Sequence, residues 1–167
     1  AMRLALDQPD LLKGLIIVDI APAPYGQDML DYVTAMQMLD LSGKRRRGEL
    51  EEELRGQVEE PGITAFLMTN LERTTGGFRW RANLQAISSG MSGISAFTYP
   101  VGSMYEGPTA FIAGEHSAYI RDDHREGINE LFPKSRIVKI KDASHWVHSD
   151  QPEAFIQTVK AFLVKVG

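Results

Sequence analysis

Apolar runs that predict β-strands alternate with amphipathic stretches that predict helices at both ends of this chain. Residues 15–20 (LIIVDI) form an apolar run interrupted only by an aspartate, which is typical of a strand buried on both faces. Two further runs predict strands: Thr109–Ala113 after a Gly-Pro pair, and Arg136–Ile140 between turn residues. The last segment predicts a helix, because its apolar residues share one helical stripe: Phe155, Ile156, Val159, Phe162, Leu163 and Val166.

The middle of the chain, from 27 to 95, has a helical pattern. Apolar residues recur there three or four positions apart in several stripes, and Gly76-Gly77 turns the chain before the last of them. The positions in these stripes are Met29, Val33, Met36, Leu39, Leu50, Leu54, Val58, Ile63, Phe66, Leu67, Leu71, Ala82, Leu84 and Ile87. A strand, a helical insertion, and then strand, helix, strand and helix predict an α/β sheet protein with a helical cap. We expect residues 1–26 and 96–167 to form the sheet domain and residues 27–95 to form the cap.

Composition and charge argue against several classes of protein, namely nucleic-acid-binding, membrane and disulfide-containing proteins. The 167 residues are 43% hydrophobic and 24% charged, as in a soluble globular domain with a sizeable core. The net charge of −4 argues against a general affinity for nucleic acid or an anionic membrane, and no segment is long and apolar enough for a membrane helix. The basic run Lys44–Arg47 precedes several glutamates, and the spacing of Arg47 and Glu51 favours a solvated helix face over a binding patch. The absence of cysteine excludes disulfides and thiolate metal sites, and we expect a cytoplasmic protein.

One histidine lies where parallel-sheet proteins build active sites. His145 follows the last predicted strand, within the segment Asp142–Pro152, and precedes the last helix. A histidine there can accept a proton from a hydroxyl nucleophile near neutral pH, although a surface-loop histidine fits the position equally well. His148, three residues further on, raises metal ligation as an alternative. No carboxylate–histidine motif supports that alternative, so we expect no metal.

Polar residues that follow the other predicted strands are candidates for the same site. Asp19 ends the first apolar run, where a carboxylate is costly to bury unless it is paired. It either orients an imidazole or caps the loop that follows. Glu115 is the only carboxylate in the turn after the second strand. Ser117 in that turn hydrogen-bonds the imidazole or the acid, or is an ordinary turn serine.

Four segments together resemble one known family. Val18–Pro22 (VDIAP), Phe78–Leu84 (FRWRANL), Gly107–Thr109 (GPT) and Ser144–His148 (SHWVH) have an order and spacing similar to those of the YbfF-type esterases of the α/β-hydrolase superfamily and their mitochondrial relatives. The similarity runs from residue 1 to the end of the chain. It includes the cap, which in that family is a small helical bundle over the site.

The resemblance implies a Ser-His-Asp site with an additional serine. On this sequence the acid falls on Asp19, the auxiliary serine on Ser117 and the histidine on His145. Such enzymes carry the nucleophilic serine in a G-x-S-x-G elbow. This sequence has none: Gly90–Ile94 (GMSGI) echoes it, but ends in isoleucine and follows no strand. Because Ala1–Leu4 resembles the helix that follows the elbow, we expect the nucleophile and the oxyanion-hole donors upstream of residue 1.

The sequence therefore predicts the C-terminal part of an α/β-hydrolase sheet with an inserted helical cap, which supplies the general base, the acid and the lid for hydrolysis of a carboxylic ester or acyl thioester. The alternatives are a catalytically inactive binding or structural protein and another reaction of the superfamily, such as dehalogenation. The cap methionines Met29, Met36 and Met38 suit an acyl chain or, more simply, the core of the cap.

The net charge, the predicted strands and the resemblance together set the expected partners and location. We expect no cofactor and neither nucleic acid nor membrane as a partner. A complementing amino-terminal hydrolase segment or an oligomer is expected, because the strand at 15–20 would have one uncovered edge. In a eukaryote, the mitochondrial relatives extend the expected location to the mitochondrial matrix.

Overall fold

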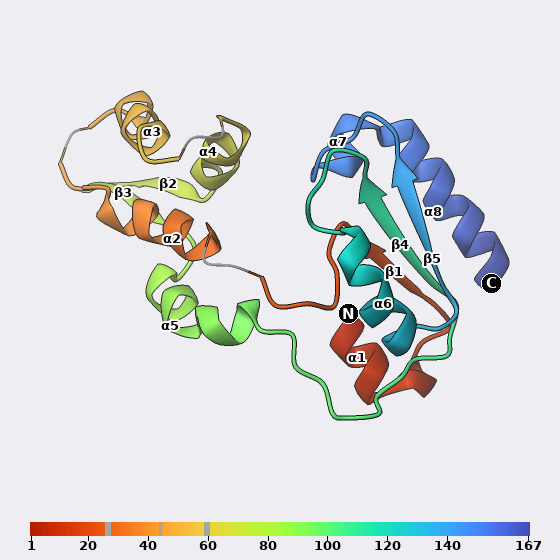
Figure 1. Cartoon of the computed structure of the whole chain (residues 1–167). Helices are drawn as coiled ribbons and strands as arrows, with labels where there is room; N and C mark the ends of the chain where they lie inside the picture. Colours follow the sequence, from red (N-terminus) through yellow and green to blue (C-terminus); the bar gives the residue numbers. More distant parts are fainter. Residues whose placement is uncertain (26–27, 44, 59–60) are drawn as a thin grey trace. The chain divides into compact units, whose positions relative to one another are not determined.

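The computed structural model describes residues 1–25, 28–43, 45–58 and 61–167 (Figure 1). The chain divides into two compact units, one made of residues 1–23 and 97–167 and the other of residues 24–96. Each unit has a hydrophobic core of its own. The domain boundary expected from the sequence falls on Gly26 and Gln27, which lie outside the described residues.

The first unit is built on a three-stranded parallel sheet, which confirms the expected α/β class. Its strands are β1 (Leu15–Val18), β4 (Thr109–Gly114) and β5 (Ser135–Ile140), in the spatial order β1-β4-β5. The register pairs Val18 with Ile112 and Gly114 with Ile140. Every residue of β4 is buried, as expected for the central strand of a sheet covered on both faces.

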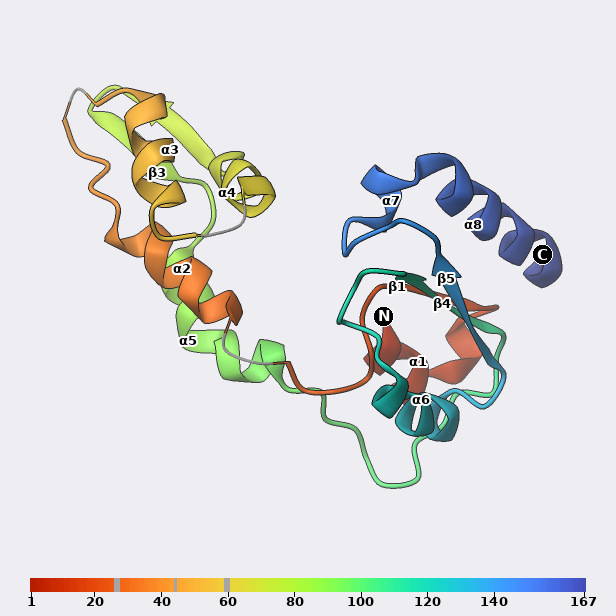
Figure 2. The same cartoon turned by 45° about the horizontal axis from the view of Figure 1, so that its top comes forward.

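Helices cover both faces of this sheet (Figures 1 and 2). Helix α8 (Pro152–Val166) and the short α7 (Val147–Asp150) lie on one face, and α1 (Met2–Asp7) and α6 (Arg125–Leu131) lie on the other. Because successive strand residues point to opposite faces, each face has its own apolar cluster. Phe111 belongs to the cluster under α1 and α6, and its neighbour Ile112 belongs to the cluster under α8.

Two short 3₁₀ turns complete the unit. One, Pro9–Leu11, follows α1, and the other, Asp122–His124, precedes α6. The sequence predicts one helix from 121 to 131, whereas the structure forms the 3₁₀ turn first and the α-helix after it. An ion pair of 2.9 Å between Arg125 and Asp122 joins the 3₁₀ turn to the first residue of α6.

The second unit contains helices and one hairpin. The helices are α2 (Asp28–Met38), α3 (Arg47–Arg55), α4 (Pro61–Met68) and α5 (Leu84–Ser95). The expectation of helix throughout is wrong at one place, where β2 (Leu71–Thr74) and β3 (Gly77–Trp80) form an antiparallel pair.

Gly77 explains why the hairpin turns at this point. Its φ of 140° is open to glycine and strained for other residues, and a Cβ there would lie 2.5 Å from the Leu41 carbonyl oxygen. The predicted Gly76-Gly77 turn is therefore present, but it joins two strands. Leu71, placed by its spacing in a helical stripe, instead pairs with Trp80 across the hairpin.

The apolar stripes of the second unit form its core. The buried members of the predicted stripes are Val33, Met36, Leu39, Leu50, Leu54, Val58, Leu71 and Leu84. The three methionines of interest divide between the core and the surface. Met36 is 3% exposed and is a core residue, whereas Met29 and Met38 are 48% and 70% exposed.

The basic run of the second unit is used in internal contacts. Lys44 lies outside the described residues. Arg45 pairs with Glu53 at 2.6 Å. The interaction of Arg47 with Glu51 that the spacing favoured is replaced: the Arg47 guanidinium donates to the backbone carbonyl oxygens of Met68 and Leu71, and Glu51 pairs with Arg55.

No helix among the described residues combines the length and the apolar character that a membrane-spanning helix requires.

Candidate active site

The site is built around a buried carboxylate at the carboxyl end of β1. Asp19 follows β1 directly and takes a left-handed backbone conformation with φ of 48°. Its N–H still donates to the Ile112 carbonyl oxygen at 2.8 Å, so the residue remains attached to the sheet. Its side chain is 1% exposed, and one carboxylate oxygen, Oδ1, accepts the Gly114 N–H at 3.1 Å. A buried carboxylate of this kind requires such partners to offset its lost hydration.

His145 meets the other oxygen of the same carboxylate. It lies in the loop between β5 and α7, 126 residues from Asp19 in the sequence, and its Nδ1 is 2.8 Å from Asp19 Oδ2. The loops after β1 and β5 meet because the carboxyl ends of parallel strands lie at one edge of the sheet. The His145 side chain is 44% exposed, so the imidazole bridges a buried acid and the surface.

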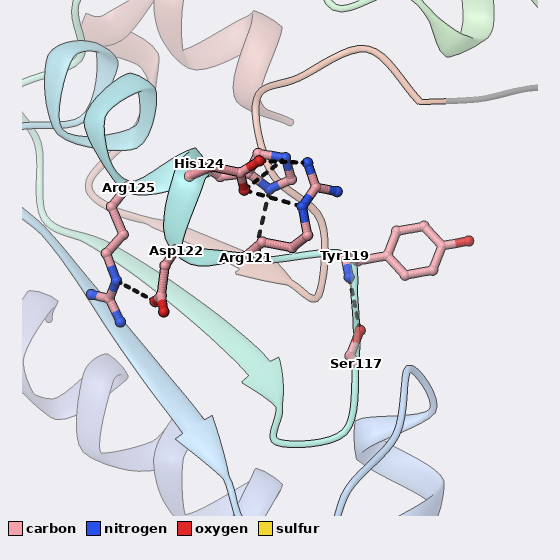
Figure 3. Close-up of polar contacts among 7 residues, drawn as sticks. Ser117, Tyr119, Arg121, Asp122, His124 and Arg125 are labelled. Carbon is pink, nitrogen blue, oxygen red and sulfur yellow. Dashed lines mark hydrogen bonds and ion pairs between the residues drawn. The ribbon is translucent and has the colours of Figure 1, made fainter.

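Ser117 contributes a second contact to Asp19 Oδ2. It lies in the loop after β4, and its hydroxyl donates to that oxygen at 2.5 Å. Its Oγ also accepts the Tyr119 N–H at 3.2 Å, a contact drawn in Figure 3. The structure thus brings Asp19, Ser117 and His145 together, with the carboxylate contacting both of the other side chains.

Tyr119 is a site residue that the sequence analysis missed. Its ring stacks on the His145 imidazole, with ring centroids 4.1 Å apart and an angle of 24° between the planes. A closed set of contacts results: Asp19 contacts Ser117 and His145, Ser117 accepts the Tyr119 N–H, and Tyr119 covers His145. An aromatic residue two positions after the candidate serine was the available signal.

A second aspartate shapes the loop that carries His145. Asp150 accepts hydrogen bonds from the backbone N–H of Ser144 at 2.8 Å and from its hydroxyl at 2.5 Å. The hydrogen bond from the Ser144 hydroxyl, followed by that from its N–H, holds the pKa of Asp150 below its ordinary value. Ser144 Oγ in turn accepts the Trp146 N–H at 3.2 Å. The residues on both sides of His145 are therefore fixed by hydrogen bonds.

The loop after β5 also approaches the end of β4 very closely. A Cβ on Gly114 would lie 2.0 Å from the Ser144 carbonyl oxygen and 2.7 Å from that of Ala143. These are backbone atoms, so no side-chain movement would make room for it. Glycine is required here because the loop must reach Asp19 across the end of β4.

The other residues that the sequence raised as possible site residues make different contacts. Glu115 accepts the Asp142 N–H at 3.0 Å, and no contact joins it to the imidazole of His145 among the described residues. His148 makes edge-to-face ring contacts with Trp146 and Phe155. Ser92, in the segment that echoes an elbow, is an exposed residue within helix α5.

One group of side chains is spaced closely enough to hold a metal ion. Among the described residues, ligand atoms of Glu115, His116 and Asp142 lie within 4.8 Å of one another, and all three residues are exposed. This group differs from the pair formed by His145 and His148 that the sequence raised.

The arrangement around His145 suits proton transfer. When the neutral imidazole donates its Nδ1 proton to the Asp19 carboxylate, the lone pair of Nε2 is available to accept a proton. The carboxylate also stabilises the imidazolium that then forms. Ser117 hydrogen-bonds the Asp19 carboxylate, and among the described residues no hydrogen bond joins it to the His145 ring. The site therefore holds an imidazole and a buried carboxylate in an arrangement that suits proton transfer.

Comparison with known proteins finds esterases and lipases as relatives of this chain. No family model matches the chain. The chain is 40% identical to the sn-1-specific diacylglycerol lipase ABHD11 of Danio rerio over 98% of this chain and 53% of that protein. It is 26% identical to the Escherichia coli esterase YbfF over 97% of this chain and 62% of that protein. A solved marine microorganism esterase, 32% identical, superimposes with a TM-score of 0.90 over 97% of this chain and 65% of that one.

The chain belongs to the α/β-hydrolase superfamily. The resemblance to YbfF-type esterases stated from its motifs is confirmed, and the sheet with its helices is part of an α/β-hydrolase fold. This α/β-hydrolase chain spans about half the length of the first curated relatives that it matches.

We expect Tyr119 to fix the plane of the His145 imidazole in this α/β-hydrolase. Replacing Tyr119 with alanine should remove the stacked ring and let the imidazole rotate away from Asp19 Oδ2. Phenylalanine at this position keeps the ring and serves as the matched control. The measurement is ¹⁵N NMR of the two ring nitrogens of His145, which reports the tautomer. An unchanged tautomer in Tyr119→Ala would mean that Asp19 alone orients the ring.

Proposed function

We propose that this chain supplies the general base and the acid of a serine hydrolase that acts on carboxylic esters or acyl thioesters. The observation that carries the proposal is the 2.8 Å contact between His145 Nδ1 and the buried Asp19 carboxylate, which brings together the loops after β1 and β5 across the end of β4. The names of the relatives support the reaction class, since they are an esterase and a lipase. His145 is the proposed base, Asp19 the acid and Ser117 the residue that holds the acid.

The proposed reaction needs a serine from a further segment of polypeptide, because no G-x-S-x-G occurs in the 167 residues. As the serine oxygen bonds to the acyl carbon, His145 Nε2 accepts the hydroxyl proton and Asp19 stabilises the imidazolium. The proton then passes to the leaving alcohol or thiol as its bond to the acyl carbon breaks. Water, deprotonated by His145, releases the acid and regenerates the serine.

The second unit is proposed as the lid of this site, as the cap at residues 27–95 was expected to be. Exposed methionines are flexible and polarizable, and such side chains suit acyl chains of varied shape. Met29 and Met38 are exposed and are the candidates for this contact, whereas Met36 serves the core. An acyl ester agrees with the name of the Danio rerio relative, a diacylglycerol lipase.

A chimera tests the proposed function directly. This chain would replace the segment that it matches in the marine microorganism esterase, whose remaining length would supply the missing part. We expect the chimera to hydrolyse p-nitrophenyl esters or acyl-CoA, and the chain alone to show no turnover by an acyl-enzyme route. Turnover by the chain alone, with acylation of Ser117 or Ser92 in mass spectrometry, would place the nucleophile within this sequence.

The free edge of β1 is the proposed site for a complementing segment or a second copy. In the described part of the chain, β1 pairs with β4 alone. Leu15 N–H and Asp19 N–H both point toward the β4 side, donating to Pro108 and Ile112 carbonyl oxygens. Since strand groups alternate, the amides of Ile16 and Val18 face the other edge.

We expect pairing at this edge to slow hydrogen exchange selectively. In a monomer the amides of Ile16 and Val18 should exchange quickly, while Leu15 and Ile17 serve as internal controls on the β4 side. Addition of a complementing segment, or self-association seen by sedimentation, should protect Ile16 and Val18 at the edge. A monomer that keeps both amides protected would show that the chain covers this edge itself.

An inactive binding or structural protein is the second candidate. The observation that favours it is the missing elbow, because losing the nucleophile removes most of the catalytic advantage of a triad. A folded chimera that binds an acyl ester without hydrolysing it would select this alternative.

A further inference from the structure

A cavity of about 280 Å³ opens between the sheet of the first unit and the second half of α8. It lies at the amino ends of β4 and β5, where Thr109, Ala110 and Arg136 line it. From α8 it is lined by residues spaced along one face of the helix, namely Thr158, Ala161, Phe162 and Lys165. All of these residues belong to one compact unit, so the cavity does not depend on the second unit.

Arg136 occupies an unusual place in this cavity. In β5, alternate residues Arg136, Val138 and Ile140 point to the same face of the sheet. Val138 and Ile140 pack in the apolar cluster under α8, so this is the face that the helix covers. Arg136 therefore follows an apolar row at its exposed end and ends in a guanidinium.

Small side chains leave the space open at this end of the layer. Ala110 pairs with Arg136 in the sheet register, and Ala161 lines the cavity from the helix. Toward the other end, larger side chains fill the same layer, among them Ile112, Val147 and Phe155. The small side chains of buried Ala110 and exposed Ala161 thus contribute to a cavity whose lining also includes the apolar residues Val138 and Phe162.

The charge around the cavity has one sign. Lys134, Arg136 and Lys165 line it, and no carboxylate does. Within the described residues no ion pair joins any of these three to an acidic side chain. Arg136 differs in this respect from the other arginines of the first unit, each of which pairs with an aspartate: Arg3, Arg121 and Arg125.

We propose that this cavity binds a small anionic amphiphile, an alkyl or acyl chain that ends in a carboxylate or a phosphate. The three cations would hold the anionic head, and the guanidinium can donate two parallel hydrogen bonds to either group. The apolar lining residues would take the first carbons of the chain. Its volume is near the lower end of ligand sites, which limits the bound part to a short chain.

This site is separate from the pair formed by Asp19 and His145. That pair lies at the carboxyl ends of the strands, and the cavity lies at their amino ends. Ala110 in the cavity and Gly114 beside Asp19 lie four positions apart along β4, roughly 13 Å. Binding at this site therefore requires neither a nucleophile nor ester hydrolysis.

NMR titration of the 167-residue chain with octanoate tests the proposal, with octyl phosphate and octanol as parallel probes. We expect the amide signals of Ala110 and Thr158 to shift with octanoate or octyl phosphate, and the comparison tells which head group is preferred. Octanol, which has the chain without the charge, should bind about tenfold more weakly. Added salt should weaken binding of the two anions and leave octanol unaffected.

Charge variants separate this site from general attraction to a basic surface. Arg136→Gln should weaken octanoate binding about tenfold. Lys160→Gln, in helix α8 but outside the cavity, is the matched control and should change octanoate binding less than twofold. Circular dichroism checks the fold of each variant, and Lys165→Gln replaces Arg136→Gln if the latter unfolds. Equal binding of octanol and octanoate, equal effects of Lys160 and Arg136, or no shift at Ala110 and Thr158 would each overturn the proposal.

Discussion

Replacing His145 with alanine in the active chimera should lower ester turnover roughly 10⁶-fold, the scale of the loss when the histidine of a serine protease triad is removed. The reason is that serine, base and acid act as a unit, so a serine without its base is a poor nucleophile. The fold should change little, because the His145 side chain is 44% exposed. The measurement is kcat for p-nitrophenyl ester hydrolysis, with thermal unfolding as the check on structure.

His148→Ala is the matched control for this experiment. His148 lies three residues away in the same region, is exposed, and makes ring contacts with Trp146 and Phe155. We expect it to retain most of the activity of the unmodified chimera. If the two alanine variants lost activity equally, the loop as a whole would be responsible, and His145 would have no special role as base.

Replacing Asp19 with asparagine should lower kcat by about 10⁴, with the histidine still in place. The amide cannot stabilise an imidazolium, and its NH₂ group favours the tautomer in which Nδ1 is the acceptor. Nε2 would then carry the proton and could not accept another. Asp19 is fully buried and also receives the Gly114 N–H and the Ser117 hydroxyl, so some loss of stability is expected as well.

Glu115→Gln is the control that decides which carboxylate acts as the acid. Glu115 is the carboxylate of the turn after β4, but it accepts the Asp142 N–H. Its replacement should leave kcat within a few-fold of the parent protein. A large loss in Glu115→Gln with little change in Asp19→Asn would transfer the role of acid from the end of β1 to the turn after β4.

The pattern of apolar residues determined much of the first unit. All three strands were predicted within two residues of their observed ends, because buried parallel strands read as short apolar runs between turn residues. The final helix was predicted from one stripe, and α8 runs from Pro152 to Val166. Local sequence suffices to locate such elements, because burial on both faces of a strand or on one face of a helix requires its own apolar pattern, whichever distant segment covers it.

The hairpin of the second unit shows where local patterns fail. Leu71 stands at helical spacing from Leu67, yet it pairs with Trp80 in a strand. Four-residue strands are too short for their alternation to be distinguished from one turn of a helix. The predicted pairing of Arg47 with Glu51 is also wrong. The guanidinium of Arg47 instead donates to the carbonyl oxygens of Met68 and Leu71, which lie more than 20 residues away and are invisible to a local pattern.

The sequence by itself named Asp19, Ser117 and His145 as candidates, from polar residues at strand ends and from the resemblance. Only the tertiary structure decided that they meet, because the contact between Asp19 and His145 spans 126 residues and depends on strand order. The stacking of Tyr119 on His145, and the position of Arg136 at the exposed end of an apolar row, were also decided by the tertiary structure. Residue type fixes what a side chain can do chemically, and packing of distant segments fixes which partners it finds.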